Sequence, residues 1–300
     1  MPANPRFGFV AVLGAPNAGK STLVNRLVGA KVSIVSPKVQ TTRSRVLGIA
    51  LRGAAQIVFI DTPGIFTPRR RLERAMVRAA WRGAEDSDAI VMLFDVQRRG
   101  IDEDSERIIA GLRKAGRKAI LALNKIDLVK RDKLLALAAK LHAEGVFSDV
   151  FMISAESGDG VEDLATALAA LMPDGPWHYP ADQLTDLPLR LLAAEITREH
   201  LFRQLHEELP YQLAVESEAW QEFENGGVRI GQVIHVQRDN QRAIVLGKAG
   251  QRVKAVREAA QRELAAMLGR KVHLFLHVKV REGWAEDAGH YREIGLEFDV

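Results

Sequence analysis

The sequence contains no cysteine, few aromatic residues and no long hydrophobic run. The absence of cysteine from all 300 residues excludes disulfide frameworks and thiolate metal sites. No apolar run reaches the roughly 18 residues that a membrane-spanning helix needs, and no N-terminal segment has the pattern of a signal peptide. We therefore expect a soluble, cytoplasmic chain with no transmembrane segment, and its length suggests two domains.

Charge is distributed unevenly along the chain, although the net charge is only +4. The first 180 residues contain 26 Lys and Arg against 19 Asp and Glu, whereas the remaining residues contain 16 against 19. The net negative charge of the second half disfavours nucleic-acid binding over its whole surface. Any such site there must therefore lie in a local basic patch.

Residues 14–21, GAPNAGKS, have the G-x-x-x-x-G-K-S spacing of a phosphate-binding loop. The two glycines let the backbone approach a phosphate, so that the loop N–H groups and the following helix N-terminus face the anion. Lys20 can reach the β- and γ-phosphates, and the Ser21 hydroxyl can bind Mg²⁺. An apolar run at 7–13 predicts a buried strand before the loop, and the periodicity of 21–28 predicts a helix after it. This context favours a nucleotide site over a chance glycine-rich turn.

A second motif of the same kind is DTPG at 61–64, directly after an apolar run at 55–60 that predicts a buried strand. An Asp at the end of such a strand holds Mg²⁺, here Asp61 through water, and the N–H of Gly64 would meet the γ-phosphate. Between the two motifs, the polar stretch 31–45 predicts a long loop.

The tetrapeptide NKID at 124–127 has residues that can select the base. The Asp127 carboxylate can accept hydrogen bonds from N1–H and from the exocyclic amine of guanine, whereas adenine has no donor at the first position. We expect a buried carboxylate, which would disfavour adenine by about 10⁴ or more because it would be left unpaired. Further on, SAESG at 154–158 follows a predicted strand, and the Ala155 N–H could donate to guanine O6.

These four motifs all follow strands that are predicted to alternate with helices. A doubly wound α/β sheet binds its ligand at this carboxyl edge. We therefore predict an α/β domain that binds GTP and Mg²⁺. The predicted strands are 7–13, 46–52, 55–60, 89–95, 118–123 and 149–153, and the predicted helices are 21–28, 69–82, 102–114, 132–142 and 161–171.

A GTPase also needs a loop threonine that reaches Mg²⁺ only when the γ-phosphate is present. From the residues alone, Thr41 and Thr42 are both candidates. Many small GTPases carry a water-orienting glutamine directly after the DTPG glycine; here that residue is Ile65, so catalysis must use another group. Asn17 in the phosphate loop either binds a monovalent cation or only shapes the loop.

The motifs GAPNAGKS, TTR at 41–43, DTPG followed by a hydrophobic residue, and NKID resemble those of the TrmE–Era–EngA branch of bacterial GTPases. The segment VSIVSPKVQTTRSRVLGI at 32–49 is similar to the Era family in particular. This resemblance covers nearly the whole chain. It implies that Thr42, directly before Arg43, is the Mg²⁺-binding switch threonine, and that Asn17 can hold K⁺.

The predicted nucleotide and metal site combines residues from all of these motifs. The residues expected to bind the nucleotide are Asn17, Ala18, Gly19, Lys20, Ser21, Thr22, Asn124, Lys125, Asp127, Ser154 and Ala155. Those expected at the γ-phosphate and in the switch segments are Gly14, Thr42, Asp61 and Gly64, and the expected Mg²⁺ ligands are Ser21, Thr42 and Asp61.

The second half has a different pattern, which predicts a smaller α+β domain. Residues 172–188 contain four prolines and predict a linker, so that the expected parts are 1–175 for the GTPase domain, 176–188 for the linker and 189–300 for the second domain. The predicted elements of that domain are a helix at 189–209, strands at 211–218 and 228–238, helices at 242–246 and 251–268, and a strand at 271–280.

The sequence GKAG at 247–250 joins the last two of these helices. A GxxG corner beside a small sheet lets an RNA backbone approach two helix ends, as in a KH domain. Residues 245–272 contain seven Lys and Arg and only two Glu, which supplies the local basic patch. Two strands before the GxxG indicate a type II KH domain rather than an ordinary helix corner. The residues expected to bind RNA are Gly247, Lys248, Ala249, Gly250, Arg252, Lys254 and Arg257.

The resemblance also implies a function. Members of the Era family bind 16S rRNA near its 3′ end during maturation of the small ribosomal subunit, with GTP and GDP as ligands, and associate peripherally with the inner face of the cell membrane. Two alternatives stay open. One is a nucleotide-sensing RNA-binding protein with negligible turnover, which Ile65 favours; the other is a GTPase that acts on tRNA or protein, with GKAG as a plain corner.

Three further features are not assigned by these motifs. The predicted helix 69–82 has a basic face, which is either a solvated face or an RNA site. His235, His273 and His277 lie on predicted strands without acidic or cysteine residues at ligand spacing, so ordinary strand histidines are favoured over a metal site. The terminal segment 289–300 alternates in polarity and is expected to dock or pair with another element.

Overall fold

The computed structural model describes every residue except Met1, Ala3, Pro37, Val39, Gln40, Arg99, Glu207, Glu208, Ala285 and Glu286. The chain divides into two compact units. The first unit comprises Met1–Ser33, Thr42–Asp186 and Arg292–Val300, and the second comprises Ile34–Thr41 and Leu187–Tyr291. The domain boundaries expected at residues 175 and 188 stay a prediction.

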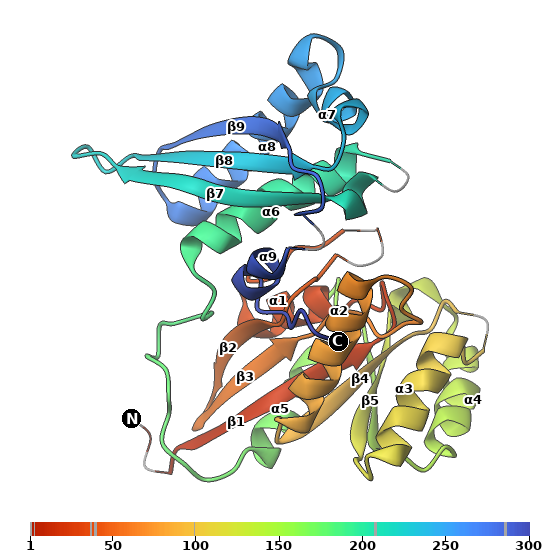
Figure 1. Cartoon of the computed structure of the whole chain (residues 1–300). Coiled ribbons are helices and arrows are strands. Elements are labelled where there is room, and N and C mark those ends of the chain that lie inside the picture. The colour runs from red at the N-terminus through yellow and green to blue at the C-terminus, as the bar shows by residue number, and fades with distance from the viewer. Residues whose placement is uncertain are drawn as a thin grey trace. The chain divides into compact units, whose positions relative to one another are not determined.

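A six-stranded sheet organises the first unit, with strand order β2-β3-β1-β4-β5-β6 (Figure 1). Only β2 runs antiparallel to its neighbour, and the other pairs are parallel. The strands are β1 (Arg6–Gly14), β2 (Val46–Arg52), β3 (Ala55–Asp61), β4 (Ala89–Asp95), β5 (Ala119–Asn124) and β6 (Phe147–Ile153).

Helices cover both faces of this sheet, because its central strands are apolar on both sides. On β1, Val12 packs against α1 (Lys20–Val28) and α5 (Val161–Leu171), while the next residue, Leu13, faces the other layer. That layer consists of α2 (Arg71–Glu85), α3 (Glu103–Lys114) and α4 (Arg131–His142). The predicted doubly wound α/β fold is confirmed.

The segment predicted as a linker is hydrogen-bonded to the first unit over much of its length. The Trp177 indole donates to the Ala54 carbonyl at 3.0 Å, and the Ile49 N–H donates to the Leu184 carbonyl at 2.8 Å. The Thr185 hydroxyl also donates to the Leu47 carbonyl at 2.7 Å. Because β2 is an edge strand, the bonds to Ile49 and Leu47 satisfy backbone groups that would otherwise be open to pairing with another chain.

The second unit is a three-stranded sheet with order β7-β8-β9, and α6 and α8 pack on one of its faces (Figure 1). Strand β8 is antiparallel to β7 and parallel to β9. The elements are α6 (Leu189–Gln204), β7 (Leu213–Glu222), β8 (Val228–Val236), α7 (Asp239–Leu246), α8 (Gln251–Leu268) and β9 (Val272–Val280), and a terminal helix, α9 (Ala288–Glu293), begins here.

Several boundaries in this unit differ from the sequence-based expectation: α6 ends at Gln204 rather than at 209, and β7 spans Leu213–Glu222 rather than 211–218. In addition, α7 begins at Asp239 rather than at 242, and β8 ends at Val236 rather than at 238. The cause is a cap: the Gln241 side-chain oxygen accepts hydrogen bonds from the N–H groups of Gln237 and Arg238, at 2.8 and 3.2 Å. Capping by a Gln at the third helical position satisfies donors that a helix start leaves open. Among the described residues, no helix is both long and apolar enough to cross a bilayer.

Candidate functional site

The phosphate loop lies between β1 and α1, in a conformation that requires its small residues. Gly19 has φ 98° at the start of α1, and a Cβ there would lie 2.3 Å from the Asn124 side-chain nitrogen. Asn17 has φ 61°, a left-handed conformation that Asn adopts more readily than most residues. The second glycine of the motif is therefore required by the close approach of the NKID segment.

Lys20 is held inside the loop by two backbone acceptors. Its Nζ donates to the carbonyl oxygens of Gly14 and Ala15, both at 3.1 Å, and only 6% of the residue is exposed. Burial lowers the pKa of Lys20 to about 8; the Asp61 charge opposes this effect and the Arg98 charge adds to it. A bound phosphate would supply the negative charge that this buried ammonium group lacks.

The three predicted Mg²⁺ ligands converge from three different elements. The Ser21 hydroxyl donates to Asp61 Oδ2 at 2.7 Å and lies 3.0 Å from the Thr42 hydroxyl, which is itself 3.4 Å from the same Asp61 oxygen. Asp61 is fully buried, and among the described residues its Oδ1 has no hydrogen-bond partner. Burial raises the pKa of Asp61, against the lowering effects of the Ser21 hydrogen bond and the Lys20 charge. Oxygen ligands with an unsatisfied buried carboxylate oxygen fit Mg²⁺ and its water shell.

The geometry favours Thr42 over Thr41 as the switch threonine. Thr42 is 9% exposed and turned toward Asp61, whereas the Thr41 hydroxyl donates to the Lys38 carbonyl at 2.8 Å. After the DTPG motif, Ile65 is fully buried in the core beneath α2 and α3, so this position cannot orient water.

Asn124 connects the base-selecting motif to two other loops. Its Nδ2 donates to the Ala18 carbonyl at 2.8 Å, and its Oδ1 accepts from the Ala155 N–H at 2.9 Å. The Ala155 N–H, expected to donate to guanine O6, donates to Asn124 in this structure, and its role toward the base stays a prediction. Lys125 has φ 70°, and its Nζ lies 2.6 Å from Asp95 Oδ2.

The expected burial of Asp127 is wrong. The residue lies on a single 3₁₀ turn, Ile126–Leu128, and its side chain is exposed. Discrimination against adenine must therefore come from the two hydrogen bonds that guanine can donate, because water can satisfy the carboxylate when a wrong base is present.

The remaining predicted nucleotide residues shape the loops around the site. Ala18 is buried in the core, and Thr22 is half-buried in the first turn of α1. The buried Ser154 accepts the Ser157 N–H at 3.1 Å through its hydroxyl. Together with Asn124, these residues position backbone groups at the carboxyl edge of the sheet.

Sequence reasoning missed Arg98, which lies just after β4 at the same edge of the sheet. Its guanidinium donates to the Pro16 carbonyl at 2.7 Å and forms an ion pair with Asp102 at 2.7 Å. This cation therefore holds the phosphate loop in place. The rule that ligands bind at the carboxyl ends of strands could have pointed to it, because Asp95 ends β4 three residues earlier.

In the second unit, the GKAG segment forms a tight corner between α7 and α8. Gly247, Ala249 and Gly250 have φ values of 71°, 50° and 75°. A Cβ at Gly247 would lie 2.7 Å from the Arg252 Cβ, and the Arg252 guanidinium donates to the Ile244 carbonyl across the corner. The exposed residues here are therefore Lys248 and Ala249, with Lys254 exposed on the first turn of α8 and Arg257 turned toward Glu258, 3.2 Å away.

The basic face of α2 has a partner within the first unit. Glu297 forms ion pairs with Arg78, at 3.2 Å, and with Arg82, while the Arg71 guanidinium lies 4.3 Å above the Phe298 ring. The C-terminal segment thus docks on this helix. The arginines of this face stay largely exposed, with Arg78 and Arg82 each 51% exposed, so the interpretation as a solvated face holds for much of it, and RNA binding there stays a prediction.

Two family models and many known proteins match this chain. A family model described as 50S ribosome-binding GTPase matches residues 9–125, and a KH domain model matches residues 208–285. The chain is 58% identical over 308 aligned residues to the GTPase Era of Caulobacter vibrioides (strain NA1000 / CB15N), covering 98% of each chain. It is also 58% identical over 293 residues to the GTPase Era of Afipia carboxidovorans, covering 98% of this chain and 95% of that protein.

Two solved structures are similar over almost the whole chain. One is Era in complex with MgGDPNP and nucleotides 1506–1542 of 16S ribosomal RNA, and the other is a single-residue variant of Aquifex aeolicus Era bound to GDP·AlF₄⁻. Each is 38% identical, covers 97% of this chain and 99% of its own, and has a TM-score of 0.91.

Proposed function

The chain belongs to the Era family of GTPases, and on that premise we propose that it is a GTP-hydrolysing switch that binds 16S rRNA near its 3′ end and assists maturation of the small ribosomal subunit. The observation that supports this most directly is the convergence of Ser21, Thr42 and Asp61 beside the buried Lys20. A buried cation next to three oxygen ligands matches a phosphate–metal site.

The residues have defined roles in this proposal. Lys20 exchanges its two carbonyl acceptors for phosphate oxygens, and the Gly64 N–H donates to the γ-phosphate. Ser21, Thr42 and Asp61 hold Mg²⁺, which when bound neutralises phosphate charge. Because Thr42 follows a loop, the presence of the γ-phosphate orders that loop, and hydrolysis releases it.

Because Ile65 stands where many small GTPases carry a water-orienting glutamine, another group must support hydrolysis. We propose that Asn17 holds a K⁺ ion beside the phosphates, as the family resemblance implies. The alternative, that Asn17 only shapes the loop, is supported by its left-handed backbone. Hydrolysis that is faster in K⁺ than in Na⁺ distinguishes the two.

RNA recognition is assigned to the corner at 247–250 in the second unit. Its exposed Lys248 and Ala249 lie between two helix ends, and Lys254 adds charge on α8. We favour 16S rRNA over a target on the large subunit because the matches to the two differ in how much of the chain they cover. The 50S description belongs to a model that matches 9–125 alone, whereas the Era–16S rRNA complex matches 97% of the chain.

We further propose a cytoplasmic location with peripheral association at the inner face of the membrane, which rests on the family resemblance. Flotation with vesicles that contain anionic lipid tests this part, and a chain that stays at the bottom of the gradient with and without GTP would contradict it.

The experiment for the main proposal is GTP hydrolysis in K⁺ and in Na⁺ buffer, each with and without a single-stranded fragment from the 3′ end of 16S rRNA. We expect the RNA to stimulate hydrolysis. The double variant Lys248→Asp, Ala249→Asp should lose that stimulation, because two carboxylates would then face the RNA backbone.

Each rival has its own outcome in the same experiment. Negligible turnover under all four conditions would favour a passive nucleotide-sensing RNA-binding protein. Stimulation that survives in the double variant would favour a GTPase whose GKAG segment is a plain helix corner.

A further inference from the structure

The sheet of the second unit has a second face, opposite α6 and α8, and its edge strand carries rings and cations there. Alternate residues along β9 share one face of the strand. The helix-facing set, which includes Leu274, is buried, whereas Phe275 on the other face is 44% exposed. The residues of this open face are Lys271, just before the strand, then His273, Phe275, His277 and Lys279.

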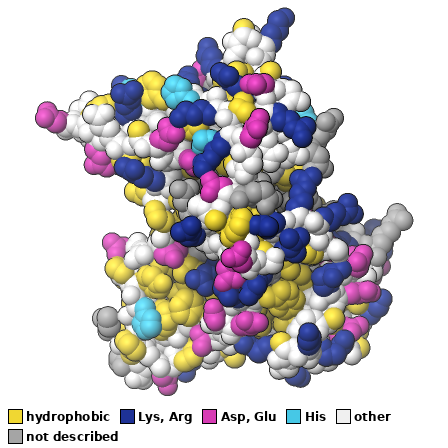
Figure 2. Space-filling view, viewed as in Figure 1, with side chains coloured by type: hydrophobic (Ala, Val, Ile, Leu, Met, Phe, Trp, Pro, Cys, Tyr) yellow, Lys and Arg dark blue, Asp and Glu magenta, His cyan; other side chains and the backbone are white. Residues whose placement is uncertain are grey.

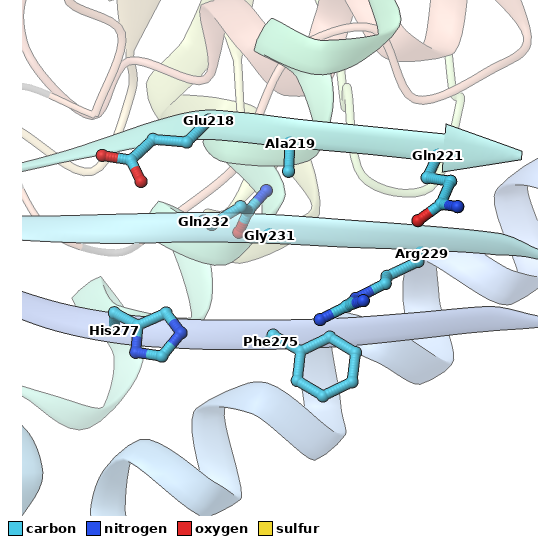
Figure 3. A pocket seen from close by; sticks show the side chains of 8 residues that line it. All are labelled: Glu218, Ala219, Gln221, Arg229, Gly231, Gln232, Phe275 and His277. Carbon is cyan, nitrogen blue, oxygen red and sulfur yellow. The ribbon is translucent and has the colours of Figure 1, made fainter.

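A hollow of about 360 Å³ lies on this face, next to Phe275 (Figure 3). Its floor is Gly231 of β8, which pairs with Ala219 on one side and with Phe275 on the other. Because Gly231 has no side chain and Ala219 has a small one, the sheet is open at this point between larger neighbours. The volume is at the lower end of the range for small-ligand sites.

Arg229 lies at the rim of the hollow, with its guanidinium 4.8 Å from the centre of the Phe275 ring. Among the residues that the structure describes, neither Arg229 nor Lys271 forms an ion pair, and both are exposed. The positive charge at this end of β9 is therefore not neutralised by the protein.

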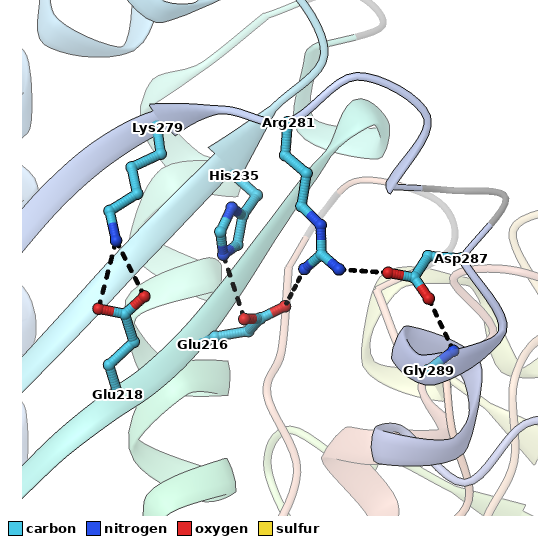
Figure 4. A network of polar contacts seen from close by, with 7 residues as sticks. All are labelled: Glu216, Glu218, His235, Lys279, Arg281, Asp287 and Gly289. Atoms are coloured by element: carbon cyan, nitrogen blue, oxygen red, sulfur yellow. Dashed lines mark hydrogen bonds and ion pairs between the residues drawn. The ribbon is translucent and has the colours of Figure 1, made fainter.

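The carboxylates of this face come from β7 and are paired (Figure 4). Glu218 accepts from Lys279 at 3.1 Å, and Glu216 bonds His235 at 3.1 Å and Arg281 at 3.7 Å. Cationic, histidine and hydrophobic side chains are visible together on this face in Figure 2. The carboxylates from β7 are thus neutralised, in part by Lys279 of β9, while the end of the face that carries Arg229 and Lys271 stays positive.

From these observations we propose that the open face of β9 is a second binding site for single-stranded RNA, distinct from the GKAG corner. We call it the β9 platform, and it consists of Lys271, His273, Phe275, His277 and Lys279 of β9 with Arg229 of β8. It rests on the proposed RNA-binding function and extends it, because RNA held at 247–250 would continue across the edge strand.

The chemistry of the β9 platform fits unpaired bases better than other ligands. Alternate strand residues are about 6.7 Å apart along the backbone, so the rings of Phe275 and His277 can each stack on one base, whereas the His273 ring lies 6.0 Å from that of Phe223 in an edge-to-face arrangement. A guanidinium beside an exposed ring adds a second planar surface, and the neighbouring cations attract the phosphate backbone. Stacking on rings requires no particular base, so the β9 platform would add affinity rather than sequence selectivity.

The test compares two RNAs from the 3′ end of 16S rRNA by fluorescence anisotropy, with a non-hydrolysable GTP analogue present. One has about four nucleotides, the number that a KH groove holds, and the other is extended by several nucleotides at each end. Phe275→Ala should weaken the longer RNA about 5- to 100-fold, the loss expected for one stacked base, and leave the short RNA unchanged. Phe275→Trp should restore binding.

Two controls separate stacking from a change in fold. Leu189→Ala removes a 50% exposed apolar side chain from α6 of the same unit and should leave both RNAs unaffected. A 2-aminopurine base in the extension should change its fluorescence on binding to the unaltered chain and not to Phe275→Ala. Thermal unfolding of each variant shows that the fold is retained.

The outcomes distinguish this inference from the proposed function. If Phe275→Ala binds the longer RNA normally, while Lys248→Asp with Ala249→Asp loses both RNAs, the β9 platform is refuted and the proposed function stands. If the unaltered chain binds neither RNA, both are refuted. If Phe275→Ala binds both RNAs normally but binds ribosomal particles more weakly, the β9 platform contacts protein and the RNA inference is overturned.

Discussion

The buried position of Lys20 suits phosphate binding, but it lowers the free energy of unfolding of the nucleotide-free protein. Its pKa is lowered from 10.5 to about 8, chiefly by burial. The unfolded chain therefore binds more protons than the folded chain between these two pH values, so this group opposes folding most strongly below pH 8. The opposition is relieved as the pH rises toward 10.5. At about 1.4 kcal/mol per pKa unit, the cost at neutral pH is at most about 3.5 kcal/mol.

The perturbation is Lys20→Met, which keeps the length of the side chain and removes the charge. Between pH 7 and 9.5, nucleotide-free wild type should gain about 2 kcal/mol relative to this variant, a relative rise in the unfolding midpoint of roughly 4–8 °C for a unit of this size. Differential scanning calorimetry of both proteins at both pH values measures this difference, because all other titrating groups are shared.

Mg²⁺ and a GTP analogue supply the control. A bound phosphate stabilises the ammonium form of Lys20, so the relative gain with pH should disappear when the wild-type protein is loaded. Parallel pH dependence in nucleotide-free wild type and Lys20→Met would refute the reasoning, since it would show that burial does not disfavour the charge.

Three further predictions concern the base motif and the C-terminal segment. Asp127→Asn should shift preference from guanosine toward xanthosine nucleotides, because xanthine has a carbonyl oxygen where guanine has its amine, and the Asn amide can donate a hydrogen bond to it. Competition binding measures this shift, and unchanged GTP affinity would contradict the assignment of Asp127. Asn124→Ala removes two buried hydrogen bonds, to Ala18 and Ala155, and should weaken GDP binding about 10- to 100-fold by calorimetry; an effect below twofold would count against a role in joining the loops. Glu297→Lys should release the C-terminal segment from Arg78 and Arg82, seen as faster carboxypeptidase digestion, whereas Glu144→Lys, which breaks the separate surface pair with Arg113 at 2.9 Å, should not; equal digestion rates would contradict the docking.

The strands and the phosphate-side site were predictable because their signals are local. Strand β4 at 89–95 is buried on both faces and stands out as an apolar run, and GAPNAGKS specifies a loop by its spacing. The start of α7 at Asp239 was missed because it depends on one capping side chain, Gln241, which composition does not reveal.

Features that depend on contacts between residues far apart in the sequence were harder to predict from it. The choice between Thr41 and Thr42 depends on which hydroxyl turns toward Asp61, about twenty residues away in sequence. Docking of Glu297 on α2 joins residues more than two hundred positions apart. Asp127 is exposed because it lies on the single 3₁₀ turn Ile126–Leu128. A turn this short has no hydrophobic periodicity from which burial could be predicted.

If the chain is a GTP-dependent switch that binds RNA, as we propose, its affinity for RNA should depend on which nucleotide is bound. The affinity of the full chain for the 3′-terminal fragment of 16S rRNA is determined with GDP and with a non-hydrolysable GTP analogue, at fixed Mg²⁺ and salt, because RNA affinity depends strongly on salt. We predict that the affinity differs between the two nucleotide states. Equal affinity in the two nucleotide states would contradict it.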